Sequence, residues 1–359
     1  MCKRIMAVQT NTDSGVPFYK IGTIGEKADA YISKELFDEY KKKYSFPRKG
    51  EVMITCAGTV GKCIIYNGED SYYQDSNIVW IDNPDEIITN EFLYHLLRKV
   101  NWSKLNSTTI VRIYNDDLRN LKFDIPQHEE QKKITRLLSL IDKRIATQNK
   151  IIGDLKLLKS AIIEEHYKKT EKQIVSVADL GQPFNVGNLS KEDLSETGHL
   201  CIIYGELFTT YGATINVVES HTHKFHGMTL SRKGDLLFPS STTVDAVSLI
   251  APSVINVDGV VLGGDMFGIH ISSNFNPQYL SYFFNLIARN QLAKYAKGST
   301  IIHLHYKEIE KAKLLLPSLE EQNRMATCMA AFDERITIEN TIQKSLMIQK
   351  QYLLRQMFI

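Results

Sequence analysis

The sequence predicts an α+β protein made of two mixed globular halves, each followed by a long helix. The stretch that begins at Pro126 and the stretch that begins at Pro317 repeat one another without a gap, at a constant offset of 191 residues. Both stretches have heptad-like apolar spacing, and each is preceded by short apolar runs bounded by turn residues. We therefore expect two halves related by a pseudo-two-fold, separated by two long antiparallel coiled-coil helices.

The bulk composition is that of an ordinary globular protein. A chain of 359 residues can hold two domains with cores of their own. No run of about 18 apolar residues occurs, so we expect no membrane association. The five cysteines are scattered and never form C-x-x-C, which favours reduced thiols in a cytoplasm over disulfides or a zinc site. The net charge of +2 gives no indication of nucleic-acid binding by itself.

The globular halves, 1–125 and 173–316, share one order of elements. In the first, GVPFYKIGTI, GEVMITCAGTVGKCIIY and DSNIVWI are typical of strands, and a helix is expected at about 90–100. The second half repeats this order. Smaller signals also correspond: Gly50-Glu51 with Gly234-Asp235, Asp75 with Asp265, and residues 107–118 with 298–309.

The two halves differ at their starts. The first has 14 residues before GVPFYK, whereas the second has 25 before GHLCII. An opening element of the second half is therefore expected to be missing or compressed in the first.

The long helices are predicted over 126–172 and 317–359. Each has glutamates in its first turn, where the helix dipole favours them. About 40 residues at 1.5 Å each give a rod of about 60 Å. A lone heptad helix favours dimerisation between chains, but two copies in one chain favour antiparallel pairing within it. The apolar seam is Ile134, Leu138, Ile141, Ile145, Ile152, Leu155 and Ile162 in the first copy and Met325, Met329, Phe332, Ile336, Leu346, Leu353 and Met357 in the second.

Polar residues interrupt this seam. Polar seam residues lower stability but fix register and partner choice. They are Gln148, Lys159, Glu339, Gln343 and Lys350.

A doubled P-x-x-E-E-Q followed by D-x-R-I-x-x-x-N, each after a strand-rich region, resembles the specificity subunit of type I restriction–modification systems. The phrases PFYKIGTIG, ISKELFDEYKKKY, GTVGK and YYQDSNIVWI are similar to that family's first target-recognition domain. The resemblance covers essentially the whole chain. It implies target-recognition domains at 1–125 and 173–316 and conserved spacer helices at 126–172 and 317–359.

The resemblance also implies function and partners. The chain would read a bipartite, asymmetric double-stranded DNA target without catalysis or a cofactor of its own. It would dock two methyltransferase subunits, which bring S-adenosylmethionine and modify adenine, and restriction subunits with ATP-dependent translocase–nuclease activity. Half-sites about one helical turn, roughly 34–36 Å, apart suit a stiff spacer. Balanced charge is explained if the partners make most phosphate contacts.

Two other functions remain open from the sequence. One is a silent or truncated adaptor that binds partner subunits without recognising DNA, which the short start favours. The other is a self-sufficient nuclease or methylase, which is disfavoured because the chain has no N-P-P-Y-like motif and no glycine-rich cofactor loop after a strand.

Candidate DNA contacts are basic clusters for phosphates and small polar residues for base edges. A solvated face is the alternative for the lysine cluster, and core packing is the alternative for the tyrosines. In the first half the candidates are Lys41, Lys42, Lys43, Arg48, Lys49, Tyr72, Tyr73, Gln74, Ser107, Thr108, Thr109 and Arg112. In the second half they are Lys224, Arg232, Lys233, Ser240, Ser241, Thr242, Thr243, Lys294, Lys297, Ser299, Thr300 and His303.

Two other patterns are less indicative of a site. The histidines of SHTHKFH (His221, His223 and His226), with His303 and His305, have no cysteine or carboxylate at a useful spacing, so no metal is expected. Gly58, Gly61 and Lys62 have two residues between the glycines where a phosphate-binding loop has four, which predicts a turn.

Overall fold

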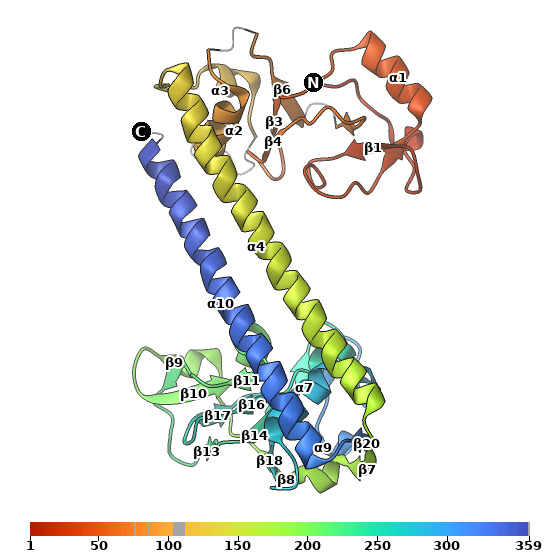
Figure 1. The fold of residues 1–359 in the computed structure, drawn as a ribbon, viewed down its shortest axis with the longest axis vertical. Coiled ribbons are helices and arrows are strands. Elements are labelled where there is room, and N and C mark those ends of the chain that lie inside the picture. Colours follow the sequence, from red (N-terminus) through yellow and green to blue (C-terminus); the bar gives the residue numbers. More distant parts are fainter. Residues whose placement is uncertain (75–76, 85–86, 103–111, 358–359) are drawn as a thin grey trace. The chain divides into compact units, whose positions relative to one another are not determined.

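The computed structural model describes residues 1–74, 77–84, 87–102 and 112–357 (Figure 1). The chain forms two compact units, Met1–Asn149 with Ile342–Ile359, and Lys150–Thr341. Each unit therefore contains one globular half and part of both long helices, α4 (His128–Lys169) and α10 (Leu319–Met357). No helix in the described ranges is long and apolar enough to cross a membrane.

The first half contains two three-stranded sheets. One has the order β2 (Tyr31–Ile32), β1 (Val16–Tyr19), β5 (Tyr72–Tyr73), and the other has β4 (Cys63–Ile65), β3 (Val52–Thr55), β6 (Ile78–Ile81). Its helices are α1 (Lys34–Lys43), α2 (Asn90–Lys99) and α3 (Asn115–Arg119). Met53 faces one apolar core with Phe37 and Tyr72, while Val52 and Ile54 face another with Leu97.

The second half enlarges the same plan into two five-stranded sheets. The first has β13 (Thr229–Leu230), β17 (Val261–Gly263), β10 (His199–Ile203), β12 (His221–Thr222) and β9 (Leu194–Ser195). The second has β11 (Thr214–Ile215), β16 (Ser253–Ile255), β14 (Asp235–Pro239), β18 (Met266–Ile271) and β8 (Gly181–Asn185). Two-stranded pairs join β15 (Ser241–Thr242) to β19 (Ile302–His303), and β20 (Lys313–Leu316) to β7 (Gln173–Ser176).

Short helices complete the second half. The longest of them, α7 (Pro277–Leu286), buries most of its residues in the main core. The others are α5 (Glu206–Thr209), α6 (Ala246–Leu249), α8 (Arg289–Ala293) and α9 (Tyr306–Ile309), with the 3-10 turns η3 (Val177–Leu180) and η4 (Lys191–Asp193).

Backbone hydrogen bonds within each half show which residues of the two halves are equivalent. Leu304 N–H donates to Ser240 O at 2.9 Å, and Ile113 N–H donates to Cys56 O at 2.9 Å. Ile113 and Leu304 belong to the segments that the sequence paired, so the match of 107–118 with 298–309 holds for the described part of those segments.

One predicted correspondence is wrong. Ser240 N–H donates to Asp265 O at 2.7 Å, and its counterpart Cys56 N–H donates to Asn77 O at 2.7 Å. The residue equivalent to Asp265 is therefore Asn77 and not Asp75, which lies outside the described residues. The loops before the two strands differ in length, which shifted the comparison by two residues.

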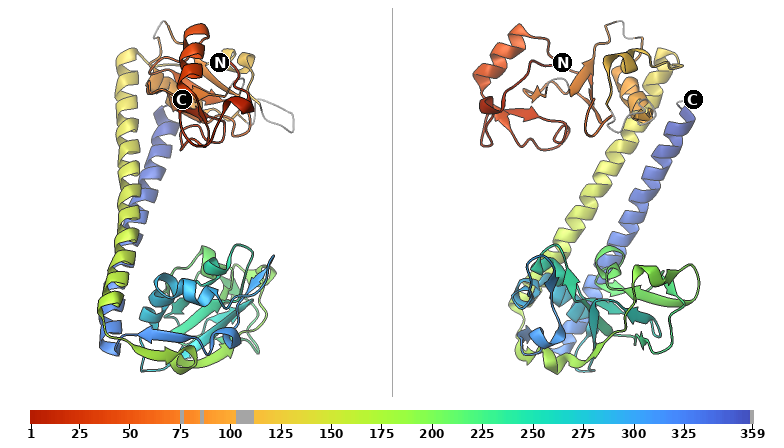
Figure 2. Two further views of the ribbon diagram at one scale, coloured as in Figure 1. Left: turned by 90° about the vertical axis from the view of Figure 1, so that its right-hand side faces the viewer. Right: turned by 180° about the vertical axis from the view of Figure 1, so that it is seen from behind.

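The predicted antiparallel pairing of the long helices is confirmed, and both views of Figure 2 show them side by side. In one unit Lys350 Nζ forms an ion pair with Asp142, and in the other Lys159 Nζ forms an ion pair with Asp333. Both members of one pair lie 191 residues from the members of the other. Two lysines predicted as polar seam residues thus join opposite helices, and every predicted apolar seam residue is buried or half-buried.

The glutamine of each E-E-Q motif ties a long helix to a short one. Gln131 and Gln322 are each 1% exposed. Gln322 Oε1 accepts from Asn276 N–H, which precedes α7, at 3.0 Å, and its Nε2 donates to Pro317 O at 2.9 Å. Gln131 makes the same two contacts, with Thr89 N–H at 2.7 Å and Pro126 O at 2.9 Å. The motif therefore fixes where each long helix leaves its globular half.

His95 makes the first unit sensitive to acid. It lies buried on α2, and burial, followed by the nearby Lys350 ammonium, lowers its pKa to about 4. Because the folded pKa lies below the ordinary value of 6.5, the unfolded chain binds more protons between these values. The stability that neutral His95 contributes is thus complete above about pH 6.5 and is lost as the pH falls toward 4.

We expect His95→Tyr, which copies Tyr282 at the equivalent position of α7, to reduce this acid-induced loss of stability. Urea unfolding of the original chain and the variant at pH 7 and pH 5 measures the change in the free energy of unfolding. An equal decrease in both proteins contradicts the prediction.

Candidate nucleic-acid interface

Most of the second-half reading candidates gather at one end of β14. β15 pairs with β19 in the register Ser241 with His303 and Thr242 with Ile302. We call these four residues, with Thr243, Lys297, Ser299 and Thr300, the polar strand pair. Ser240 is buried and lies just before it. The structure thus brings together two candidate segments that are about 60 residues apart in the sequence.

The loop that carries Ser299 and Thr300 is held closed. Lys297 N–H donates to His303 O at 2.9 Å, and His303 N–H donates to Lys297 O at 2.7 Å. Gly298 has a φ of +121°, and a Cβ there would lie 2.0 Å from Ile301 O, so the turn requires glycine. The exposed hydroxyls of Ser299 and Thr300 therefore project from a backbone whose ends are fixed.

An acidic residue that the sequence did not single out for this role borders the polar strand pair. Asp265 Oδ2 lies 4.0 Å from His303 Nδ1. Asp265 also lines a hollow of about 720 Å³ with Asn188, Lys191 and Tyr204. The sequence marked Asp265 only by its mistaken pairing with Asp75, because the contact with His303 depends on how two distant loops fold.

In the first half, Arg112 takes the position of His303. It immediately precedes Ile113, whose N–H donates to Cys56 as Leu304 N–H donates to Ser240. The guanidinium lies over the ring of Tyr114, with 5.9 Å from Cζ to the ring centroid. The candidates Ser107, Thr108 and Thr109 lie outside the described residues.

Two first-half candidates are core residues. Tyr72 is 1% exposed and Tyr73 is 4% exposed, because β5 pairs in parallel with β1 and both rings pack in the apolar cluster around that sheet. The Tyr72 hydroxyl donates to Lys3 O at 3.0 Å. Core packing therefore accounts for both tyrosines, and they leave the candidate surface. Gln74 is half-buried, and its Oε1 accepts from Ile21 N–H at 3.3 Å.

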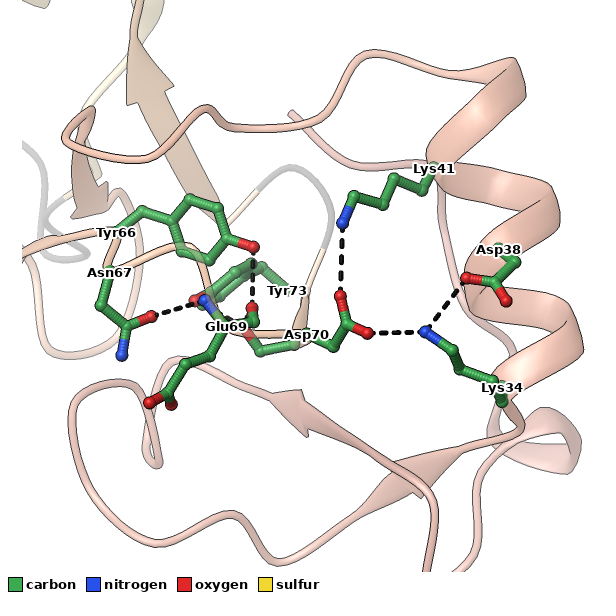
Figure 3. A network of polar contacts seen from close by, with 9 residues as sticks. Lys34, Asp38, Lys41, Tyr66, Asn67, Glu69, Asp70 and Tyr73 are labelled. Carbon is green, nitrogen blue, oxygen red and sulfur yellow. Dashed lines mark hydrogen bonds and ion pairs between the residues drawn. The ribbon is translucent and has the colours of Figure 1, made fainter.

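The lysines at the end of α1 are exposed but partly neutralised. Figure 3 shows Asp70 between Lys34, at 2.6 Å, and Lys41, at 3.3 Å. The Lys34 ammonium, with that of Lys41, lowers the pKa of Asp70. Lys43 pairs with Glu39 at 2.8 Å. Lys42 is exposed in the same turn. This network fastens α1 to the segment before β5, which favours a structural contribution beside any contact with phosphate.

The remaining basic candidates lie away from the polar strand pair. Arg232 and Lys233 precede β14, whereas Ser240 to Thr243 follow it, so they lie at opposite ends of that strand. Arg48 and Lys49 occupy the equivalent turn before β3. In each turn the backbone N–H of the arginine donates to an acidic side chain at 2.8 Å: Arg48 to Glu51, and Arg232 to Asp235.

Two more basic candidates lie elsewhere in the second half. Lys224 pairs with Asp193 at 2.7 Å. Lys294 is exposed just after α8.

The glycine motif has a structural explanation. Gly58 and Gly61 form the turn between β3 and β4, as predicted, and a Cβ at Gly61 would lie 2.2 Å from the Trp102 ring. Among the residues that the structure describes, no group of three or more histidine, cysteine or acidic side chains is placed to hold a metal ion.

Comparison with known proteins identifies relatives along the chain. A model of the type I restriction modification DNA specificity domain matches residues 1–157 and again 169–347. A putative type I restriction enzyme specificity subunit from Haemophilus influenzae is 47% identical over 171 residues, which is 48% of this chain and 43% of that protein. The putative MjaX specificity subunit of Methanocaldococcus jannaschii is 22% identical over 93% of this chain and 81% of its own.

Solved structures show the same fold. The S subunit of a type I restriction–modification system from M. genitalium aligns over 100% of this chain and 92% of its own, with a TM-score of 0.63 at 14% identity. A chain from a structure described as showing complex assembly and conformational transition of the type I R-M system aligns over 96% and 91%, with a TM-score of 0.57. With the doubled domain match, these findings show that the chain belongs to the DNA specificity subunits of type I restriction–modification systems.

Proposed function

We propose that the chain reads a bipartite, asymmetric DNA target, with one half-site for each globular half. The observation that carries this proposal is that the ends of β3 and β14 make the same backbone hydrogen bonds but lie beside different side chains. Arg112 stands in the first half where His303 stands in the second. Arginine pairs best with guanine, while histidine, serine and threonine accept other partners. Because Arg112 and His303 differ but occupy equivalent positions, we expect the two halves to prefer different DNA half-sites.

The long helices support docking of two identical partner subunits. Two pairs of exposed apolar residues recur at the 191-residue offset: Ile151 and Ile342, each 38% exposed, and Leu157 and Ile348, 72% and 57% exposed. Apolar exposure repeated in both copies favours a contact surface over chance. We propose that two methyltransferase subunits, which bring S-adenosylmethionine and modify adenine, bind there. ATP-dependent translocase–nuclease subunits then complete a cytoplasmic restriction complex, and this chain performs no catalysis.

Mapping of N6-methyladenine tests this function. The methyltransferase partner is expressed with and without this chain in cells that lack other adenine methylation. Methylation at one bipartite sequence, only when both are present, supports the proposal. Partner binding in a 1:2 ratio without any methylated sequence contradicts it and supports the adaptor alternative.

Arg112→Ala and His303→Ala are expected to affect different half-sites. Each lost base contact lowers discrimination by about 1–3 kcal/mol, so methylation should relax at one position and weaken overall. Arg119→Ala is the matched control, because Arg119 is exposed on α3 and, within the described residues, forms an ion pair with Asp116 of the same helix. The readout is the set of methylated sequences for each variant. Identical sets in both variants contradict separate reading by the two halves.

A further inference from the structure

Asp265 differs from the other aspartates of the second half in having no hydrogen bond to its side chain. Residues 173–316 are all described and contain six aspartates, and in five of them the carboxylate accepts from a backbone N–H and so fixes the local backbone. These five pairs are Asp179 with Ser176, Asp193 with Ser190, Asp235 with Arg232, Asp245 with Ser248, and Asp258 with Lys233. Within this range the Asp265 carboxylate has only the His303 ring beside it, at 4.0 Å, which is beyond hydrogen-bond distance. No contact of the fold therefore accounts for this side chain.

The main chain of Asp265, in contrast, is fixed. Its carbonyl accepts from the N–H of the buried Ser240 at 2.7 Å, and the Ser240 carbonyl accepts from Leu304 N–H at 2.9 Å. The carboxylate is 41% exposed and lies at the border between the polar strand pair and the hollow of about 720 Å³. An exposed side chain on a fixed backbone is the arrangement that a base-reading residue requires.

The charge of Asp265 limits what it can read. Phosphates repel a carboxylate, so its presence beside DNA is favourable only if it contacts a hydrogen-bond donor. In the major groove the amino donors are cytosine N4 and adenine N6. Adenine also presents the N7 acceptor beside N6, and a carboxylate has no donor for it. Cytosine has no such acceptor on that edge, so it is the better partner for Asp265.

His303 complements this choice. In a C·G pair the O6 acceptor of guanine lies beside the N4 donor of cytosine. The Asp265 carboxylate accepts, whereas the His303 ring can donate, and the two lie 4.0 Å apart. An acceptor and a donor side by side thus match the donor and the acceptor of one C·G pair.

The first half has an amide in place of this carboxylate. Asn77 corresponds to Asp265, because its carbonyl accepts from Cys56 N–H at 2.7 Å as the Asp265 carbonyl accepts from Ser240 N–H. The asparagine amide both accepts and donates, which suits adenine N6 and N7 together. The exchange of aspartate for asparagine at one backbone position therefore changes the favoured base from cytosine to adenine.

We propose that Asp265 is a specificity-determining residue that selects cytosine in the second half-site, and that Asn77 selects adenine in the first. This assignment rests on the proposed function and names one base that each half prefers.

Asp265→Asn tests the assignment, because it installs the amide of the first half at nearly equal volume. The chain is expressed with the methyltransferase partner, and the methylated sequences are mapped for the original chain and each variant. We expect one C·G pair of the second half-site to become an A·T pair. With Asp265→Ala any base should be accepted there, and discrimination should fall by about 5- to 150-fold. An unchanged set of methylated sequences overturns the assignment.

Asn77→Asp is the reciprocal variant. It should change one A·T pair of the first half-site to C·G and leave the second half-site as it was. A general loss of methylation without a change of base would contradict a reading role for Asn77.

Glu196→Gln is the matched control, since it also replaces a carboxylate by an amide in the second half. Glu196 is exposed in the turn before β10, at the opposite end of that strand from Tyr204, which lines the hollow. It should leave the methylated sequences unchanged. Asp265→Asn should not shift the urea midpoint, because its carboxylate has no hydrogen bond to lose. Lower stability with the original base preference would show that Asp265 is structural and would overturn the assignment.

Duplex binding provides a second readout. A duplex with N4-methylcytosine at the assigned position carries a methyl group where N4 would donate into the groove. Binding of the complex with methyltransferase should weaken by about tenfold or more for the original chain and not for Asp265→Ala. Equal weakening in both overturns the assignment.

The outcomes separate this assignment from the function on which it rests. If the original chain directs methylation to a bipartite sequence that Asp265→Asn leaves unchanged, only the assignment of Asp265 fails. If the original chain directs methylation to no sequence, the proposed function fails and the assignment fails with it.

Discussion

Gln322→Leu is expected to destabilise the second unit by about 2–3 kcal/mol. The glutamine is 1% exposed, and leucine preserves most of its volume while removing both hydrogen bonds. Asn276 N–H, which is half-buried, and Pro317 O, which is buried, would then lose their partner, and an unsatisfied buried group costs about 1–3 kcal/mol. Some of this cost is offset because leucine is better suited to a buried position. Urea unfolding with a probe in the second half measures the change.

Gln349→Leu is the matched control for this variant. Gln349 is exposed on the same helix, so its replacement should change stability by no more than about 0.5 kcal/mol. Gln131→Leu should act on the first unit as Gln322→Leu acts on the second, because Gln131 makes the same contacts with Thr89 and Pro126. Equal stability of Gln322→Leu and Gln349→Leu would show that the E-E-Q glutamine does not hold the helix to its globular half.

Lys350→Glu is expected to weaken the pairing of the long helices in the first unit by about 2 kcal/mol. The change replaces an ion pair with two carboxylates, one on each helix. Breaking a fully buried pair costs about 3–5 kcal/mol, and the value here is reduced because the Asp142 side chain is 37% exposed. Thermal unfolding and amide exchange along residues 138–149 and 346–357 report the loss.

The reversed pair provides the control. Asp142→Lys combined with Lys350→Glu restores opposite charges, so it should recover most of the stability that each single change removes. Lys344→Glu changes an exposed lysine of the same helix and should have little effect. If the double variant is no more stable than Lys350→Glu, the ion pair does not contribute to the pairing of the helices.

The repeat allowed much of the fold to be predicted, because residues at a fixed offset on two helices have the same environment. The seam lysines Lys159 and Lys350 were recognised as polar interruptions from spacing alone. Their partners Asp142 and Asp333 were visible as repeated residues, but helix spacing within one copy does not show which residue of the other copy lies opposite.

Other features depend on contacts that no local pattern contains. Gln131 meets Thr89, which is 42 residues away, so the E-E-Q motif was recognisable without its physical reason. Tyr72 and Tyr73 could be surface or core residues until the pairing of β5 with β1 settled their burial. Asp265 was paired with the wrong residue because loop lengths differ, and only the backbone hydrogen bond identifies Asn77.

The reciprocal ion pairs also bear on how the gene can change. Each long helix carries its aspartate in its first half and its lysine in its second half, so each is complementary to a copy of itself that runs the other way. Recombination between the two repeated stretches would exchange or duplicate whole globular halves while both lysine–aspartate pairs were kept. A globular half encoded by such a gene could therefore be replaced in one step, without a second mutation to repair the helices.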